Sequence, residues 1–181
     1  DEGFPLTENL FKELHDILLT SARGHNKAPG EFRRGQVFIG SETATINEAS
    51  YIPPEAHNIT DLFSNLELYL NKHEEQDTLV QLAIAHYQFE AIHPFWDGNG
   101  RVGRLLITLY LYKKGLLKKP WLYLSEYFEK HRQKYYRLLR EVSDHHAFSA
   151  WIQFFLKGVE YQSLDACTKV KHIQELETSI K

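Results

Sequence analysis

The chain has 181 residues, of which 43% are hydrophobic and 13% aromatic, and its formal net charge at pH 7 is −3. This length and apolar content suffice for one domain with a single buried core. Acidic and basic residues are interspersed without a long basic run, so the chain lacks the electrostatic footprint of a nucleic-acid-binding domain.

Cysteine usage and hydropathy indicate in which cellular compartment the chain is expected. Cys167 is the only cysteine and cannot form an intrachain disulfide, which fits a reducing, cytoplasmic environment. No apolar run reaches the roughly 18 residues that a membrane span needs, and the start is not that of a signal peptide, so we expect no membrane contact. Because methionine is absent, we expect residues 1–181 to be a fragment or the core of a longer protein.

The first element along the chain is a predicted helix. Thr7 can cap it, and its apolar residues recur with a period of 3.6 until the pattern stops near Gly24. These apolar residues are Leu10, Phe11, Leu14, Ile17 and Leu18. The segment that follows, residues 25–54, changes character.

Residues 25–54 carry the signals of β-structure. Pro29-Gly30, Gly35 and Gly40 punctuate the segment, and the runs 36–39 and 51–52 are short and β-like. We predict a small hairpin or flap here, the only strands of an otherwise all-α bundle. After it, a helical pattern begins at Ile59 and ends in the polar stretch 71–76.

Two core helices are predicted next. Asp77 can cap the first, whose residues up to Ile92 leave little polar surface, so it should be central and buried. Pro94 biases His93 out of helical geometry and ends this helix. Beyond Gly100, the apolar run 105–112 predicts a second core helix that ends at residues 113–115. Three more helical patterns follow, around 125–130, around 132–142 and from 148 onward.

The stretch between the two core helices is dense in residues that handle phosphate. It reads His93-Pro94-Phe95-Trp96-Asp97-Gly98-Asn99-Gly100-Arg101-Val102-Gly103-Arg104. Residues 98–100 open a helix, whose N-terminus offers unpaired N–H groups and a partial positive charge to an anion. Arg101 and Arg104, three residues apart, can both reach an anion held there.

Two side chains of this stretch are candidates for the reaction itself. Asp97 precedes the glycine turn, where a carboxylate could hold Mg²⁺ between phosphate oxygens. His93 can remove a proton from an incoming hydroxyl because histidine titrates near neutral pH. Taken singly, these parts are typical of a structural histidine, a plain turn and a solvated arginine pair. Their occurrence together in fixed order favours an active site.

The stretch also carries a resemblance to a known family. It matches the Fic (Fic/Doc) signature, His-x-Phe-x-Asp/Glu-Gly-Asn-Gly-Arg-x-x-Arg, at every specified position. The resemblance continues through residues 29–34, 36–40, 52–54, 85–90 and 127–136. It implies a mostly helical Fic domain over residues 1–181 that transfers AMP from ATP to a Tyr, Thr or Ser hydroxyl of a target protein and releases pyrophosphate.

The resemblance implies a role for each motif residue. His93 would deprotonate the target hydroxyl, and Asp97 would hold Mg²⁺ on the α- and β-phosphates. The anion hole would be formed by Gly98, Asn99 and Gly100, and the triphosphate tail would be bound by Arg101 and Arg104. Phe95 is interpreted as an anchor of the loop in the core.

The resemblance extends to a flap and an aromatic residue. The segment 36–52 resembles the family's flap, which covers the site and docks the target's backbone by strand addition. Ile39, Gly40 and Ser41 would border the nucleotide. Tyr136, and with a weaker case Tyr135, sits where the family places an aromatic near the adenosine. The alternative for both tyrosines is a helix face that packs into the core.

One departure concerns regulation. Many Fic enzymes carry an inhibitory helix, Ser/Thr-x-x-x-Glu-Gly/Asn, whose glutamate pairs with the second motif arginine, and this chain contains no such sequence. The chain resembles the bacterial subgroup in which that helix lies upstream. We therefore expect it before the residue matching Asp1, and a winged-helix domain could follow Lys181. A fragment lacking the helix would be less restrained than the full protein.

Several alternatives stay open at this stage. Family members also transfer UMP, phosphate or phosphocholine, some remove AMP, and a catalytically idle interaction module is a further alternative. The expected partners are ATP and a hydroxyl-bearing protein, which could be the chain itself, and a homodimer is also left open. His15, His86 and His131 have no partners at metal-ligand spacing and are interpreted as core or surface histidines.

Overall fold

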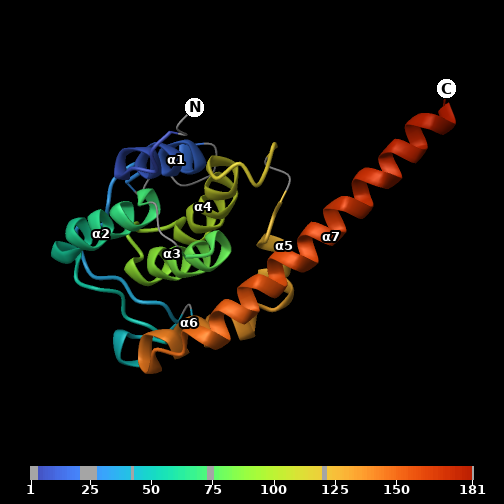
Figure 1. Ribbon diagram of the computed structural model, residues 1–181. Helices are drawn as coiled ribbons and strands as arrows, with labels where there is room; N and C mark the ends of the chain where they lie inside the picture. Colours follow the sequence, from blue (N-terminus) through green and yellow to red (C-terminus); the bar gives the residue numbers. More distant parts are fainter. Residues whose placement is uncertain (1–3, 21–27, 42, 73–75, 120–121, 181) are drawn as a thin grey trace. The chain divides into compact units, whose positions relative to one another are not determined.

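The computed structural model describes residues 4–20, 28–41, 43–72, 76–119 and 122–180. Over these residues the chain is all-α, as predicted, with seven α-helices and two short 3₁₀-helices (Figure 1). It forms two compact units, residues 1–106 and 107–181, which are described separately below. The expectation of a single domain stays a prediction.

The first unit is built from three helices and the start of a fourth. In chain order its elements are α1 (Glu8–Thr20), η2 (Ile46–Glu48), η3 (Ala56–Asn58), α2 (Ile59–Asn71), α3 (Thr78–Ile92) and the first turns of α4 (Asn99–Lys113). The helix α2 packs against both α1 and α3 (Figure 1). The rings of Phe11, Phe63 and Phe89 meet between these three helices, with centroids 5.3 to 6.3 Å apart. This aromatic cluster forms the centre of the unit's core.

The N-terminal cap predicted for α1 is confirmed, because Thr7 Oγ1 accepts a hydrogen bond from the N–H of Leu10 (3.3 Å). The buried stripe of the helix is formed by Phe11, His15 and Leu19, which follow one another at intervals of four residues. The assignment of Ile17 to the apolar face was wrong, since 58% of this residue is exposed. The predicted end near Gly24 lies outside the described residues.

The predicted core helix α3 is confirmed, including both of its ends. Asp77 Oδ1 accepts the N–H groups of Leu79 (2.9 Å) and Val80 (3.2 Å). At the other end, His93 leaves the helix in the left-handed conformation, with φ 49° and ψ 60°. The helix therefore delivers His93 at the point where the helical hydrogen-bond pattern stops.

The hairpin predicted around residues 36–52 does not form among the described residues. Only Ile39 and Tyr51 pair, as one isolated antiparallel bridge. The connection turns into η2 instead, because Glu48 and Thr45 form a capping box at its start. Phe38, in the first half of this segment, is 40% exposed, so a hairpin would bury little apolar area here. An isolated pair of strands without such burial is only marginally stable. We call residues 36–52 the flap segment below.

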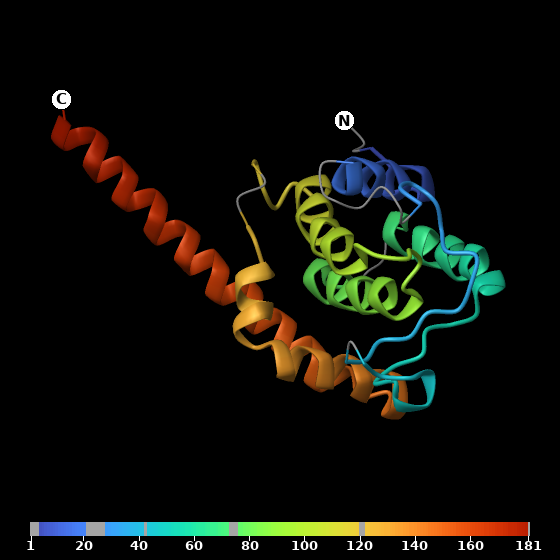
Figure 2. The same ribbon diagram turned by 180° about the vertical axis from the view of Figure 1, so that it is seen from behind.

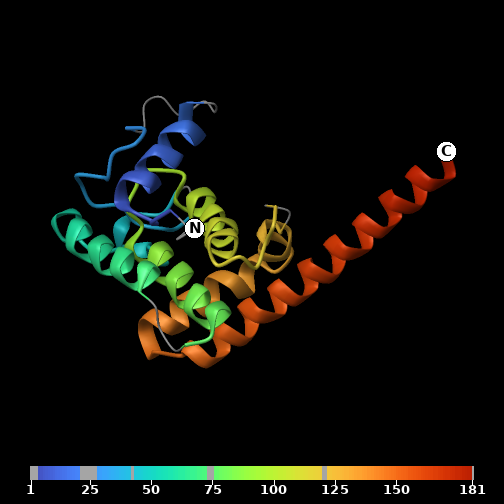
Figure 3. The same cartoon turned by 45° about the horizontal axis from the view of Figure 1, so that its top comes forward.

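The second unit holds the end of α4 and three further helices, all at the positions predicted from the sequence. These are α5 (Ser125–Lys130), α6 (Arg132–His145) and α7 (Phe148–Ile180). Both α5 and α6 pack against the first half of α7, as the view from behind also shows (Figure 2). Trp151 and Phe155 of α7 are fully buried there. The helix then continues without a break to its C-terminal end (Figure 3).

None of the described helices combines the length and the apolar character that crossing a membrane requires.

The close approach of α3 and α4 generates a first prediction. A Cβ added at Gly103 would collide with Glu90 Oε1 and lie 3.1 Å from Phe89 Cδ1. Gly103→Ala should therefore lower the free energy of unfolding by about 1–3 kcal/mol, although alanine favours helices more than glycine does. Denaturant unfolding measures this. In a Glu90→Ala background the cost should shrink, and an equal cost in both backgrounds would contradict the steric explanation.

Candidate functional site

The motif loop, residues 93–98, connects α3 to α4 and is held through its backbone. His93 has positive φ, which residues other than glycine adopt only at an energetic cost. The carbonyls from Ala91 to Asp97, except that of Trp96, each accept a hydrogen bond from a side chain or an N–H group elsewhere. The acceptor and donor pairs are Ala91 with Tyr51 Oη, Ile92 and His93 with the Arg33 guanidinium, Pro94 with Arg33 N–H, Phe95 with Asn99 Nδ2, and Asp97 with His15 Nε2. These contacts, here called the carbonyl tethers, fix the path of the loop.

Asn99 closes the loop on itself. Its Oδ1 accepts the N–H of Phe95 (2.8 Å), and its Nδ2 donates to the carbonyl of the same residue (2.8 Å). The side chain is almost fully buried, and so is that of Phe95. The amide of Asn99 is thus occupied by the loop, so only its backbone N–H remains for an anion.

The start of α4 presents the predicted anion site. Gly98 has φ 79°, a conformation that glycine adopts without strain. Its carbonyl accepts the N–H groups of Arg101 and Val102, both at 3.0 Å. The N–H groups of Asn99 and Gly100 meet no acceptor in the described part of the chain. Two adjacent donors at a helix N-terminus form a favourable site for a phosphate oxygen.

Both motif arginines flank this pair of donors. A Cβ added at Gly98 would lie 3.5 Å from Arg101 Nη2, and one added at Gly100 would lie 3.0 Å from Arg104 Nη1. Each guanidinium therefore turns back toward the start of the helix. The structure thus brings together the glycines, Asn99 and the two arginines that the sequence predicted as anion ligands.

Asp97 is placed where it could hold a cation between phosphates. Its Oδ1 accepts the N–H of Gly98 (2.6 Å), and its Oδ2 lies 3.6 Å from Arg101 Nη2, with the side chain about half exposed. The described residues contain no group of three or more His, Cys, Asp or Glu side chains that could bind a metal alone. A single accessible carboxylate beside an anion site fits Mg²⁺, which is commonly held by few protein ligands and by the substrate's phosphates.

His15 supports the loop from α1, a role that sequence reasoning missed. The N–H of Gly30 donates to its Nδ1 (3.0 Å), so Nε2 carries the proton and donates to the carbonyl of Asp97 (3.0 Å). Its ring stacks on Phe95 at a centroid distance of 3.8 Å. The interpretation of His15 as a core histidine is confirmed. Its place in the buried stripe of α1, with Phe11 and Leu19, was the available signal.

Burial disfavours the protonated form of His93 and of His86, a histidine within α3. Burial lowers the pKa of His93 to about 4, the carbonyl of Glu90 acts in the opposite direction, and the charge of Arg33 adds to the lowering. Burial also lowers the pKa of His86 to about 4, although its Nδ1 bonds to the carbonyl of Gly103 (3.0 Å). At neutral pH the imidazole of His93 is therefore unprotonated, and burial weakens its affinity for a proton.

The remaining predicted residues make their contacts outside the motif loop. Ile39 bonds to Tyr51 within the flap segment, and Ser41 accepts the N–H of Ala44 (3.0 Å). Gly40 is surrounded by residues of the same segment. The proposed contact of Ile39, Gly40 and Ser41 with a nucleotide stays a prediction.

The two tyrosines of α6 differ in their exposure. Tyr135 is 5% exposed and stacks on Phe128, so the core interpretation is confirmed for this residue. Tyr136 is 48% exposed, and Arg132 lies 5.8 Å from its ring centroid. The adenosine role of Tyr136 stays a prediction.

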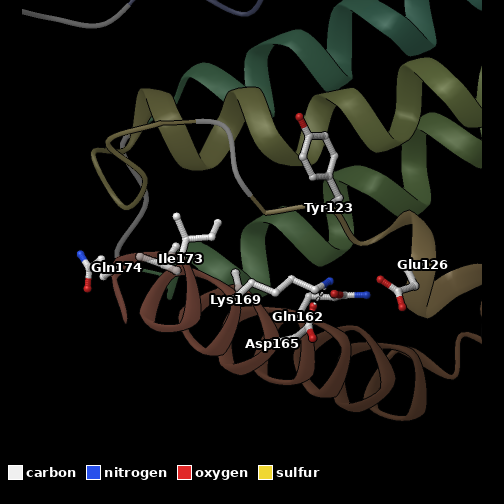
Figure 4. A pocket seen from close by; sticks show the side chains of 9 residues that line it. Tyr123, Glu126, Gln162, Asp165, Lys169, Ile173 and Gln174 are labelled. Atoms are coloured by element: carbon white, nitrogen blue, oxygen red, sulfur yellow. Dashed lines mark ion pairs between the residues drawn. The ribbon is translucent and has the colours of Figure 1, made fainter. Parts of the chain in front are cut away.

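The second unit has a hollow of its own that includes none of the predicted site residues. It measures about 520 Å³ and lies between the segment from Tyr123 to Glu126 and α7 (Figure 4). The ion pair of Asp165 and Lys169 lines it, with 2.5 Å between the charged atoms. Its mixed lining does not have the paired N–H groups and arginines that distinguish the start of α4.

Comparison with known proteins agrees with the geometry of the site. A model of the Fic/DOC family matches residues 5–111. A curated relative, the protein adenylyltransferase Fic of Culex quinquefasciatus, is 35% identical over 147 residues, which are 77% of this chain and 26% of that protein. The chain therefore spans about a quarter of the length of this relative.

Solved structures share the fold. A Fic family protein from Desulfovibrio desulfuricans G20 has a TM-score of 0.75 and 29% identity, covering 90% of this chain and 47% of its own. The BepC protein of Bartonella tribocorum, solved with bound AMPPNP, has a TM-score of 0.56 and 14% identity, covering 86% of this chain and 74% of its own. At that identity the second comparison shows the fold alone.

The double contact of Asn99 with Phe95 generates a second prediction. Asn99→Ala leaves a buried N–H and a buried carbonyl without partners and should lower the free energy of unfolding by about 3 kcal/mol. Denaturant unfolding checks this, with Asn9→Ala on the exposed face of α1 as the control, which should change stability by less than about 0.5 kcal/mol. Equal effects of the two substitutions would contradict the role assigned to Asn99.

A third prediction concerns pH. The folded-state pKa of His86 is about 4, below its ordinary value. Between about pH 6.5 and about pH 4 the unfolded chain therefore binds more protons than the folded chain. The free energy of unfolding should decrease as the pH falls through this window, by up to about 3 kcal/mol for this histidine. Unfolding curves at several pH values test this. The slope should become shallower in His86→Gln, and an unchanged slope would show that His86 does not contribute.

Proposed function

The chain belongs to the Fic/DOC family, and on this premise we propose that it is a protein adenylyltransferase. It transfers AMP from ATP to the hydroxyl of a tyrosine, threonine or serine in a target protein and releases pyrophosphate. The observation that supports this proposal is the motif loop, which joins His93 to a helix start where two arginines turn back and two N–H groups have no acceptor among the described residues. A base close to an anion site can take the proton of a hydroxyl whose oxygen attacks a bound phosphate.

His93 acts as the general base in this proposal. It takes the proton of the target hydroxyl while the oxygen forms a bond to the α-phosphorus and the bond to the β-phosphate oxygen breaks. Its pKa of about 4 ensures that the imidazole is unprotonated at neutral pH. The negative charge of a bound triphosphate would raise this pKa toward neutrality, which would make the residue a stronger base.

The start of α4 holds the phosphates. The N–H groups of Asn99 and Gly100 take up the charge that develops on phosphate oxygens, and Arg101 and Arg104 neutralise the tail. Asp97 would bind Mg²⁺, which supplies additional charge neutralisation on the phosphates when bound. Such a site works by positioning and electrostatics, the main contributions to phosphoryl-type transfer.

The relatives support the proposal within the length that they share with this chain. The Culex quinquefasciatus protein is named a protein adenylyltransferase, and the BepC structure contains the ATP analogue AMPPNP. We propose that this chain binds ATP in the same manner and docks its target on the flap segment. The extended pairing of Ile39 with Tyr51 supports strand addition by an extended peptide at this segment.

Regulation and assembly belong to the proposal as well. Arg104 is the residue that an inhibitory glutamate would engage, as in the bacterial subgroup that the sequence resembles. Modification of the chain itself is part of the same proposal and can be followed in the labelling experiment below. A homodimer is part of it as well and would be detected by the mass of the protein in solution.

The fourth prediction tests the proposed reaction. Incubation with ATP labelled at the α-phosphate should transfer label to a target protein or to the chain itself. ATP labelled at the γ-phosphate should transfer none, because pyrophosphate leaves. His93→Ala should reduce incorporation by at least about 100-fold and retain ATP binding by calorimetry. His172→Ala, on the exposed surface of α7, serves as the control and should label like the wild type.

Other results would identify the alternatives. Labelling by γ-labelled ATP would indicate phosphate transfer, and labelling by UTP but not ATP would indicate UMP transfer. Loss of label from a protein already carrying AMP would indicate the reverse reaction. Failure to bind ATP with Mg²⁺ would leave an interaction module.

A further inference from the structure

Arg33 is a buried arginine whose guanidinium bonds only to backbone carbonyls among the described residues. It is 2% exposed. Its Nε donates to the carbonyl of His93 (2.9 Å), and its Nη1 donates to that of Gly35 (2.9 Å). Its Nη2 donates to the carbonyls of Pro54 and Ile92. A buried charge is costly without partners, so this arrangement requires a compensating environment.

The end of α3 provides that environment. The last carbonyls of a helix lack partners within the helix and carry a partial negative charge. Arg33 lies at this end, where its charge and its planar set of donors match the carbonyls of Ile92 and His93. Its own backbone N–H also bonds to the carbonyl of Pro94 (2.8 Å). Three consecutive carbonyls around the candidate base are therefore held by one residue.

This matters because the backbone of His93 is strained. A residue with a side chain at φ 49° needs support from its surroundings to remain there. We propose that Arg33 is a positioning residue for His93, which holds the adjoining carbonyls and thereby keeps the imidazole in the orientation from which it accepts the proton of the target hydroxyl. This inference rests on the proposed transfer reaction and extends it to a residue outside the family signature.

The same guanidinium also anchors the flap segment. Gly35 precedes that segment and Pro54 follows its last residue closely, and both carbonyls are held by Arg33. Tyr51, within the segment, donates its hydroxyl to the carbonyl of Ala91 (2.9 Å). The flap segment and the base thus share one anchor. Arg33 would therefore fix the position of a target docked on the flap segment relative to His93.

Comparison of two neighbouring arginines tests the proposal. Arg33→Lys keeps the charge but replaces a planar fork of donors by a single nitrogen, so separate nitrogens no longer hold the carbonyls of His93 and Pro54. The turnover number for AMP transfer should fall by about 100-fold, because small displacements of a catalytic group have effects of this size. The KM for ATP should stay within about twofold of the wild type, because the anion site of α4 is left intact.

The matched control is Arg34→Lys. The side chain of Arg34 is 84% exposed, and among the described residues it pairs with Glu31 on the surface (2.8 Å). This variant should have the turnover number and the KM for ATP of the wild type. A turnover number near the wild-type value in Arg33→Lys, or equal losses in the two variants, would overturn the proposal. So would a rise in KM as large as the fall in turnover.

A second readout does not depend on turnover. In NMR spectra, the ring and Cα signals of His93 should shift in Arg33→Lys and stay in place in Arg34→Lys. If the wild type transfers AMP to no acceptor, the proposed function fails, but this comparison still decides the positioning role. Unshifted His93 signals in Arg33→Lys would overturn it.

A third measurement covers the case in which Arg33→Lys does not fold. In the wild type, the Nε proton of Arg33 should exchange with water far more slowly than that of Arg34, because it is buried and bonded to the carbonyl of His93. Equal exchange rates for the two protons would contradict the proposal.

Discussion

The structure of the site depends on the carbonyl tethers that hold residues 91–97. The polar backbone of this loop is turned inward and satisfied by groups from α1, the flap segment and α4. Buried peptide groups without partners are costly, so these contacts determine where the loop runs. Arg33 makes more of these contacts than any other residue, since its side chain donates to the end of α3 and to carbonyls on both sides of the flap segment. The left-handed geometry of His93 is a consequence of this arrangement.

Because most carbonyls of the loop are already bonded, the backbone and arginine groups left for a ligand at the start of α4 are donors. The N–H groups of Asn99 and Gly100 and the guanidinium groups of Arg101 and Arg104 are all donors. They surround a helix start that already carries partial positive charge. The carboxylate of Asp97, which is about half exposed, offers a cation a ligand beside phosphates. The arrangement therefore favours a polyphosphate with a bound metal, as the proposed adenylyl transfer requires.

Local signals in the sequence were sufficient for the helices and for the motif. The cap at Asp77, the break at His93-Pro94 and the glycines after Asp97 act over a few residues, so the chain's own chemistry reveals them. The supports of the loop could not be found in this way, because His15 and Arg33 bond to carbonyls 82 and 60 residues away. The flap hairpin failed for a related reason. Its short runs have β-like composition, but a ladder needs a buried face that only the folded chain could provide.

The central claim is that the start of α4 is the phosphate site and that the carbonyl tethers keep it in place. Titration of the chain with AMPPNP and Mg²⁺, followed by NMR at the backbone amides, tests this most directly. The largest shifts and the strongest gain in protection from exchange should occur at the N–H groups of Asn99 and Gly100. The side-chain amide of Asn99, already bonded to Phe95, should keep its protection throughout. Shifts confined to the hollow along α7, with none at Asn99 or Gly100, would contradict the account.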